Sequence, residues 1–139
     1  MKKVLQELGL NPDNSIVIGS SILQALGIRK SNDVDLVVGR GTYELLKKTG
    51  KFSAQYSVLH NFGPRTLKRA SVEIGTTWTV LGRARDIKDL KKYSVVINGI
   101  RYITIDFLYK AKKSWLKQKD VRQKDIEDVK LIEGYLLRL

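Results

Sequence analysis

The chain has 139 residues, 42% of them hydrophobic, and no cysteine, which predicts one domain over residues 1–139 and excludes disulfides, thiolate metal sites and a cysteine nucleophile. Its apolar runs are too short to span a membrane and its N-terminus lacks the apolar region of a signal peptide, so we expect a cytoplasmic protein with no membrane partner. The formal net charge of +12 favours a polyanionic partner, chiefly nucleic acid or a triphosphate.

The N-terminal half is expected to alternate short helices and strands. Apolar residues at helical spacing predict helices at residues 3–8, 22–26 and 42–48. Gly27 and Gly50 follow the second and third of these and are well placed to end them. Runs rich in apolar and β-branched residues predict strands at residues 16–18, 33–38, 52–59 and 71–74.

The C-terminal third is expected to contain a hairpin and two helices. Asn98-Gly99 between two apolar runs predicts a type I′ turn joining strands 95–97 and 100–105. Asp106 is the candidate N-cap of the next helix, and a last helix is expected from about residue 121. The order of elements predicts an α/β or α+β domain, with a small mixed β-sheet flanked by helices and a C-terminal helical pair.

Gly19 and Ser20 lie between a predicted strand and a predicted helix. The N–H groups at a helix start attract anions, the serine hydroxyl adds a donor, and glycine lets a phosphate approach the backbone closely. An ordinary serine N-cap after a tight turn would have the same sequence. The pair therefore indicates phosphate binding only in combination with the residues that follow it.

Asp33 and Asp35 lie two positions apart in a predicted strand, so their side chains share one face. Their Cα atoms would be roughly 6–7 Å apart. Two carboxylates at that spacing suit a hard cation such as Mg²⁺, and without a cation they repel each other. A pair of aspartates at a solvent-exposed strand start is the alternative.

Together these residues carry a more specific pattern. An apolar strand, Gly19-Ser20 and a helix are followed by Asp33-Val34-Asp35, with residues 21–32 between the two motifs. This pattern resembles the polymerase-β-like nucleotidyltransferase superfamily, in which Gly-Ser and Asp-x-Asp follow in that order. The resemblance implies the nucleotidyltransferase fold, two Mg²⁺ ions held by the aspartates, and transfer of a nucleoside monophosphate from a nucleoside triphosphate (NTP) to an acceptor hydroxyl. It also implies that Gly19 and Ser20 bind the nucleotide.

The C-terminal third resembles the tail of the abortive-infection toxin-type nucleotidyltransferases, in which a lysine and an Arg-x-Lys-Asp-x-x-Asp segment follow a hairpin. The matching segments are residues 98–100, 108–112 and 122–128. This resemblance implies that Lys112 contacts the triphosphate and that Lys124 and Asp125 face the nucleotide. Spacing alone also allows surface ion pairs of Arg122 with Asp125 and of Lys124 with Asp128.

The superfamily has a third carboxylate on a neighbouring strand, and two residues compete for that role. Glu73 lies in an apolar strand, on the face opposite to Val72 and Ile74. Asp106 is the competitor, although a helix N-cap explains it better. Glu73 is our prediction for the third metal ligand and catalytic carboxylate.

The acceptor has several candidates. The first is RNA, particularly a tRNA-like end, which the net charge favours. The second is a hydroxyl of a HEPN-type toxin partner, as in the small antitoxin nucleotidyltransferases, and the third is an aminoglycoside. A catalytically inactive domain that binds nucleic acid or a partner is a further alternative. Basic residues that would form an RNA track are Arg65, Lys68, Arg69, Arg83, Arg85, Lys88, Lys110, Lys112, Lys113, Lys117 and Lys119.

Overall fold

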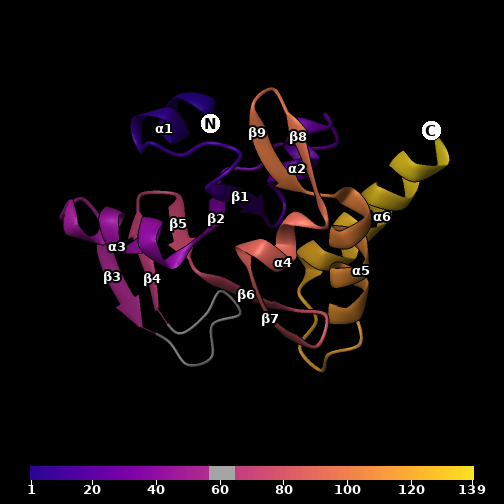
Figure 1. Ribbon diagram of the computed structural model, residues 1–139. Helices are drawn as coiled ribbons and strands as arrows, with labels where there is room; N and C mark the ends of the chain where they lie inside the picture. Colours follow the sequence, from indigo (N-terminus) through magenta and orange to yellow (C-terminus); the bar gives the residue numbers. More distant parts are fainter. Residues whose placement is uncertain (57–64) are drawn as a thin grey trace.

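A mixed β-sheet forms the centre of the fold in the computed structural model, which describes residues 1–56 and 65–139 (Figure 1). Within these residues seven strands pair in the order β3-β4-β5-β2-β1-β9-β8. Their bounds are β1 (Ser15–Ile18), β2 (Val34–Val38), β3 (Ser53–Tyr56), β4 (Arg65–Arg69), β5 (Val72–Gly75), β8 (Ser94–Ile97) and β9 (Ile100–Ile103). All four residues of β1 are buried, which agrees with its central place in the sheet.

A second, two-stranded sheet and the helices surround this centre. β6 (Thr77–Val80) and β7 (Arg83–Asp86) pair antiparallel. The helices are α1 (Lys2–Glu7), α2 (Ser21–Ala25), α3 (Arg40–Lys48), α4 (Ile87–Lys91), α5 (Ile105–Trp115) and α6 (Gln123–Leu137). Among the described residues, no helix is long and apolar enough to cross a membrane.

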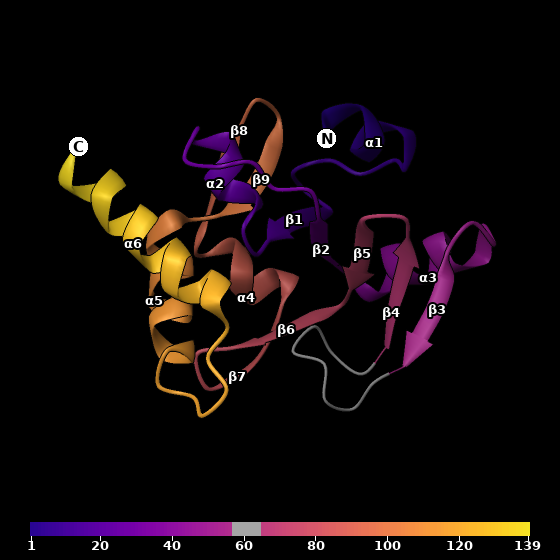
Figure 2. The same cartoon turned by 180° about the vertical axis from the view of Figure 1, so that it is seen from behind.

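The helical pair lies at one end of the molecule. Figures 1 and 2, which view the chain from opposite sides, both show α5 and α6 side by side at the end away from α3, β3 and β4. Ring contacts join this end to β6 and to the residue before β8: Phe107 lies 6.0 Å from Trp78 and 4.9 Å from Tyr93, centroid to centroid. Leu108 and Ile132 are fully buried, one on each helix. The helical pair is therefore part of the same hydrophobic core as the sheet.

The predicted hairpin is confirmed. β8 and β9 pair antiparallel around Asn98 and Gly99, which have φ of 51° and 78°. Both residues of a type I′ turn need positive φ, and asparagine followed by glycine supplies it. The predicted strand over residues 100–105 ends at Ile103, since α5 already begins at Ile105.

Asp106 is not the N-cap of α5, and this prediction was wrong. Thr104 is the cap, and its hydroxyl accepts a hydrogen bond from the Phe107 backbone N–H at 3.2 Å. Asp106 lies in the first helical turn and is exposed. The cap lies earlier because threonine has the extended backbone that a cap requires, with φ of −69° and ψ of 155°.

Other boundaries differ in detail. The strand predicted over residues 52–59 is β3, and its last part, residues 57–59, lies outside the described residues. The sequence analysis missed β4, β6, β7 and α4. Arg83-Ala84-Arg85-Asp86 carries three charges in four residues, which is atypical of a strand, yet Arg85 is buried. Its guanidinium carbon lies 5.5 Å from the centre of the Phe107 ring, and its Nε donates to the Val80 carbonyl at 3.0 Å.

The two candidate caps give a stability test. Thr104→Ala removes the hydroxyl that accepts from the Phe107 N–H and is expected to lower the free energy of unfolding by about 1 kcal/mol. Asp106→Asn keeps the cap and removes only a charge near the helix start, so its cost is expected to be a few tenths of a kcal/mol. Urea unfolding of both variants measures the difference. A larger loss for Asp106→Asn than for Thr104→Ala would contradict the assignment of the cap.

Candidate active site

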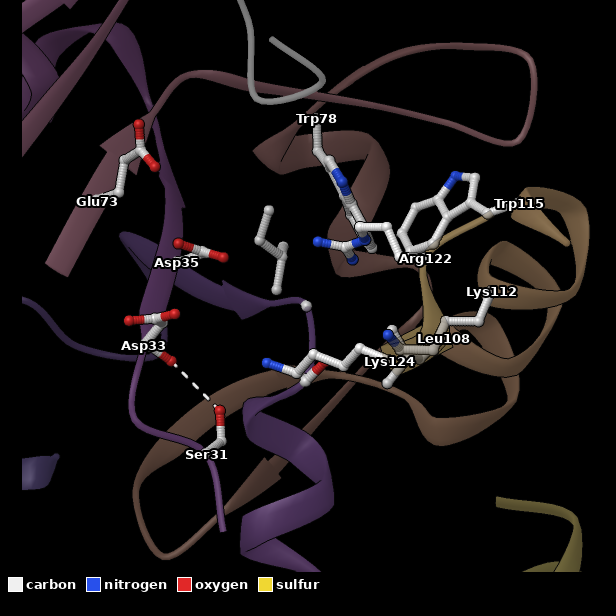
Figure 3. Close-up of a pocket in the computed structure, with 13 residues that line it drawn as sticks. Ser31, Asp33, Asp35, Glu73, Trp78, Leu108, Lys112, Trp115, Arg122 and Lys124 are labelled. Atoms are coloured by element: carbon white, nitrogen blue, oxygen red, sulfur yellow. Dashed lines mark hydrogen bonds between the residues drawn. The ribbon is translucent and has the colours of Figure 1, made fainter. Parts of the chain in front are cut away.

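Three carboxylates, Asp33 just before β2, Asp35 in β2 and Glu73 in β5, lie along one side of a cavity of about 290 Å³ (Figure 3). Asp35 is in β2, and Asp33 lies two residues earlier, so both side chains are on the same face. β2 and β5 run parallel with Asp35 in register with Glu73. The pairing therefore brings together the three residues that the sequence predicted as metal ligands, while Asp106 is not among the residues that line this cavity.

The Gly19-Ser20 turn borders the same cavity. β1 and β2 are antiparallel with Ile18 in register with Asp35, so the chain turns directly beside that carboxylate. Gly19 has φ of +71°, which glycine adopts without strain, and a Cβ added there would lie 3.5 Å from Asp35 Oδ2. The positive φ therefore favours glycine at position 19, whereas a Cβ there would make only an ordinary van der Waals contact with Asp35.

The start of α2 is tied to the start of β2. The Ser21 hydroxyl donates to the Asp33 backbone carbonyl at 3.1 Å. Ser20 is the N-cap residue of α2. Among the described residues, its hydroxyl accepts no hydrogen bond from a backbone N–H of the helix. Because α2 has only five residues, the anion-binding capacity expected here depends on the Ser20 hydroxyl and the local amides rather than on a long helix.

The carboxylates have the donor chemistry that suits magnesium, although they are not arranged as a complete site. Oxygen ligands are those that Mg²⁺ prefers, and Asp33 and Asp35 supply them from one strand face. Glu73 Oε2 accepts a hydrogen bond from the Thr66 hydroxyl at 2.8 Å. Within residues 1–56 and 65–139, no three His, Cys, Asp or Glu side chains are close enough together to hold one metal ion. The two aspartates thus have the chemistry that fits the ion, while Glu73 is held by Thr66.

The opposite side of the cavity contains a buried lysine. The Lys112 side chain is only 2% exposed, and its Nζ lies 2.8 Å from Asp125 Oδ1 and 2.9 Å from Asp128 Oδ2. Both aspartates are on α6, while Lys112 is on α5. The two carboxylates compensate the charge of the lysine, which is costly to bury alone. Lys112 borders the cavity with its ammonium group already held.

Two arginines complete this ion-pair network. Arg29 binds Asp128 through two hydrogen bonds of 2.7 and 2.8 Å, and Arg122 binds Asp125 through two of 3.1 Å. Burial by itself would raise the pKa of Asp125 and Asp128, but the hydrogen bonds from the arginines and Lys112 outweigh it and hold both pKa values below the ordinary range. Both carboxylates are therefore charged at neutral pH.

The network modifies the predicted nucleotide-binding set. Lys112 and Lys124 line the cavity, as does Arg122, which the sequence analysis did not assign to the site. Asp125 is 3% exposed and contacts Lys112 and Arg122. The pairing of Arg122 with Asp125 is present, although its carboxylate is buried. In the described part of the chain Asp128 pairs with Arg29 and Lys112 rather than with Lys124.

Two tryptophans also line the cavity, and the sequence analysis missed this role. Trp78 comes from β6 and Trp115 from the end of α5, with ring centroids 6.3 Å apart. The sequence analysis assigned neither tryptophan to the site. β6 was not predicted, so no local signal brought the two rings together.

The basic surface beside the cavity is smaller than the sequence suggested. Arg85 and Lys112 are buried, so neither belongs to a surface track for RNA. Lys68, on β4, is in register with Glu73 on β5. Lys124 lines the cavity itself. The remaining basic positions of β4 and α5 belong to opposite ends of the molecule (Figure 1).

This chain resembles known proteins in structure but not in sequence. No model of a known protein family matches the chain, and no curated protein matches its sequence. The crystal structure of ANT(2″)-Ia in complex with adenylyl-2″-tobramycin has a TM-score of 0.60 and 16% sequence identity, covering 97% of this chain and 84% of that one. A candidate nucleotidyltransferase from Thermotoga maritima has a TM-score of 0.53 and 19% identity, covering 99% and 93%. The predicted fold class, a nucleotidyltransferase fold with a mixed sheet flanked by helices, is confirmed.

The buried network predicts a pH-dependent stability. Asp128→Asn leaves Lys112 and Arg29 without their shared carboxylate, and breaking such a pair is expected to cost about 3–5 kcal/mol at pH 7. Because the folded pKa of Asp128 is lowered, its contribution is complete above the unfolded pKa of about 3.9 and is lost as pH falls through the folded value. The difference between wild type and variant should therefore shrink below pH 4.

Urea unfolding at pH 7 and at pH 2.5 measures this difference. Asp120→Asn is the matched control, because Asp120 is exposed in the loop after α5. Its effect is expected to stay within about 0.5 kcal/mol at both pH values. An equal loss for Asp120→Asn and Asp128→Asn, or a pH-independent loss for Asp128→Asn, would contradict the role of the network.

Proposed function

We propose that this protein transfers a nucleoside monophosphate from an Mg²⁺-bound NTP to an acceptor hydroxyl. The observation that carries the proposal is the register of β2 with β5, which brings Asp33, Asp35 and Glu73 into one cavity beside the Gly19-Ser20 turn. The likeness to ANT(2″)-Ia, which was solved with an adenylylated aminoglycoside, supports this chemistry on this fold.

Each residue has a role in the proposed mechanism. Asp33 and Asp35 would hold two Mg²⁺ ions, and Glu73 would complete one of the sites. Bound Mg²⁺ neutralises phosphate charge and makes the attacking hydroxyl more acidic. Glu73 would accept the proton of that hydroxyl as it attacks the α-phosphorus in line and pyrophosphate leaves.

The remaining cavity residues position the triphosphate. The Ser20 hydroxyl and the amides after Gly19 would donate hydrogen bonds to the outer phosphates. Lys124 and Arg122 would offset the negative charge that is transferred to the leaving pyrophosphate. Asp125 contacts Lys112 and Arg122, so its part is to position these cations.

For the acceptor we propose RNA. The net charge of +12 favours a polyanion. The acidic residues that line the cavity are the three proposed metal ligands, and the other charged lining residues, Lys112, Arg122 and Lys124, are cationic. Once the metal is bound, the described lining offers no further carboxylate for a polycationic aminoglycoside. A hydroxyl of a HEPN-type toxin partner is the second candidate, because the burial of Arg85 and Lys112 reduces the basic surface.

The metal site is tested by isothermal titration calorimetry with NTP and Mg²⁺. Asp33→Asn and Asp35→Asn are each expected to weaken Mg²⁺-dependent NTP binding by about 100-fold or more, since the metal contributes several kcal/mol of charge stabilisation. Asp106→Asn is the matched control and should bind as the wild type does. Unchanged affinity in both active-site variants would contradict the proposal, and so would a loss confined to Asp106→Asn.

The acceptor is tested by incubating the protein with each labelled NTP, Mg²⁺ and total RNA, and then separating RNA from protein. We expect the label in RNA, and RNA binding that weakens by orders of magnitude between about 50 and 200 mM salt, because each neutralised phosphate releases counterions. Asp35→Asn should abolish labelling. Label found on protein, or RNA affinity that does not change with salt, would favour the toxin-partner alternative.

A further inference from the structure

The cavity has two chemically different sides, and the proposed mechanism assigns no role to the two aromatic rings on one of them. Figure 3 shows Glu73 and Asp35 on one side and Trp78, Trp115 and Arg122 on the other. A triphosphate with Mg²⁺ gives the carboxylates and the cations Lys124 and Arg122 a role, but it leaves the two indole rings without one. The second side can therefore accommodate a part of the substrate other than the phosphates.

Trp115 is a fixed aromatic plane that the protein does not fully cover. Its ring meets Trp78 edge-on, at an interplanar angle of 64°, and Trp78 is itself only 4% exposed and packed against Phe107. Lys112 Nζ lies 5.7 Å from the Trp115 ring centroid. Trp115 remains partly exposed, and it borders both the active-site cavity and a second hollow of about 430 Å³ that reaches Leu81.

Arg122 provides a second plane in the same cavity wall. Its guanidinium donates two hydrogen bonds of 3.1 Å to Asp125, and Asp125 is fixed in turn by Lys112 at 2.8 Å. The arginine side chain is nevertheless 67% exposed. A guanidinium held by its edge in this way keeps its faces available for stacking.

From this wall we infer that Trp115 and Arg122 form a nucleobase-binding platform, which rests on the proposed function. A nucleobase is a flat, uncharged ring system, and it stacks on indole and on guanidinium planes whatever its sequence identity. The phosphates would lie between the carboxylates and the charged groups of Lys124 and Arg122, and the base would lie against the Trp115 ring and the face of the Arg122 guanidinium. The base belongs either to the incoming NTP or to the end of an RNA acceptor, and the two sources are separable by experiment.

Calorimetry with two ligands tests the platform. ATP and inorganic tripolyphosphate, each with Mg²⁺, are titrated into wild type, Trp115→Leu and Trp115→Phe. Trp115→Leu is expected to weaken ATP binding by about 5- to 150-fold, the range for losing one base–aromatic stack. Tripolyphosphate has no base and should bind equally to all three proteins. Trp115→Phe retains an aromatic face and is expected to recover part of the loss.

A control and a second titration make the outcome decisive. Tyr109→Leu removes an aromatic ring from α5 that does not line the cavity, and should leave ATP affinity unchanged. A short oligoribonucleotide whose affinity falls in Trp115→Leu, with ATP unaffected, would assign the platform to the acceptor base. If Trp115→Leu leaves the affinity for both ATP and the oligoribonucleotide unchanged, or lowers tripolyphosphate affinity as much as ATP affinity, the inference is overturned. Loss of ATP binding in Asp35→Asn alongside unchanged Trp115→Leu binding would overturn the platform and leave the proposed function standing.

Discussion

The register of β2 with its two neighbours is the constraint on which the site depends. β2 pairs antiparallel with β1 and parallel with β5, and both pairings fix Asp35 at the same point of the sheet. Leu36 is fully buried whereas its neighbour Asp35 is half-buried, so a slip of one residue would turn Asp35 into the core. The hydrophobic core thus determines where the carboxylates lie, although it contributes nothing to their chemistry.

The second side of the cavity depends on buried charge rather than on strand pairing. Lys112 and Asp128 are almost fully buried, and in the described residues no buried side-chain nitrogen or oxygen lacks a hydrogen-bond partner. Arg29 lies in the segment that leads from α2 into Asp33, so its bond to Asp128 connects α6 to the segment before β2. Such networks are sensitive to the loss of any one member, because the partner is left charged in a low-dielectric environment.

Local chemistry explains what the sequence could predict. The Gly19-Ser20 turn, the alternation of Asp33 and Asp35 with apolar residues, and the Asn98-Gly99 hairpin each depend on neighbours in the chain. The Arg29–Asp128 pair joins residues 99 positions apart, and the strand that brings Trp78 to Trp115 has no clear local pattern. Arg85 looks like a surface residue in sequence because its burial depends on the Phe107 and Tyr93 rings beside it. Contacts between residues far apart in the chain determine the burial and the partners of these residues, so a local sequence pattern does not predict them.

The most direct test of a metal-dependent nucleotide site is the position of a bound metal. Crystals of the protein with Mn²⁺ in place of Mg²⁺ and a non-hydrolysable NTP analogue would give an anomalous difference peak at the ion. The account predicts a peak in contact with the carboxylates of Asp33 and Asp35, with the analogue phosphates on its far side toward Ser20. Nucleotide bound with no peak at these carboxylates, or a peak at Asp106 instead, would contradict it.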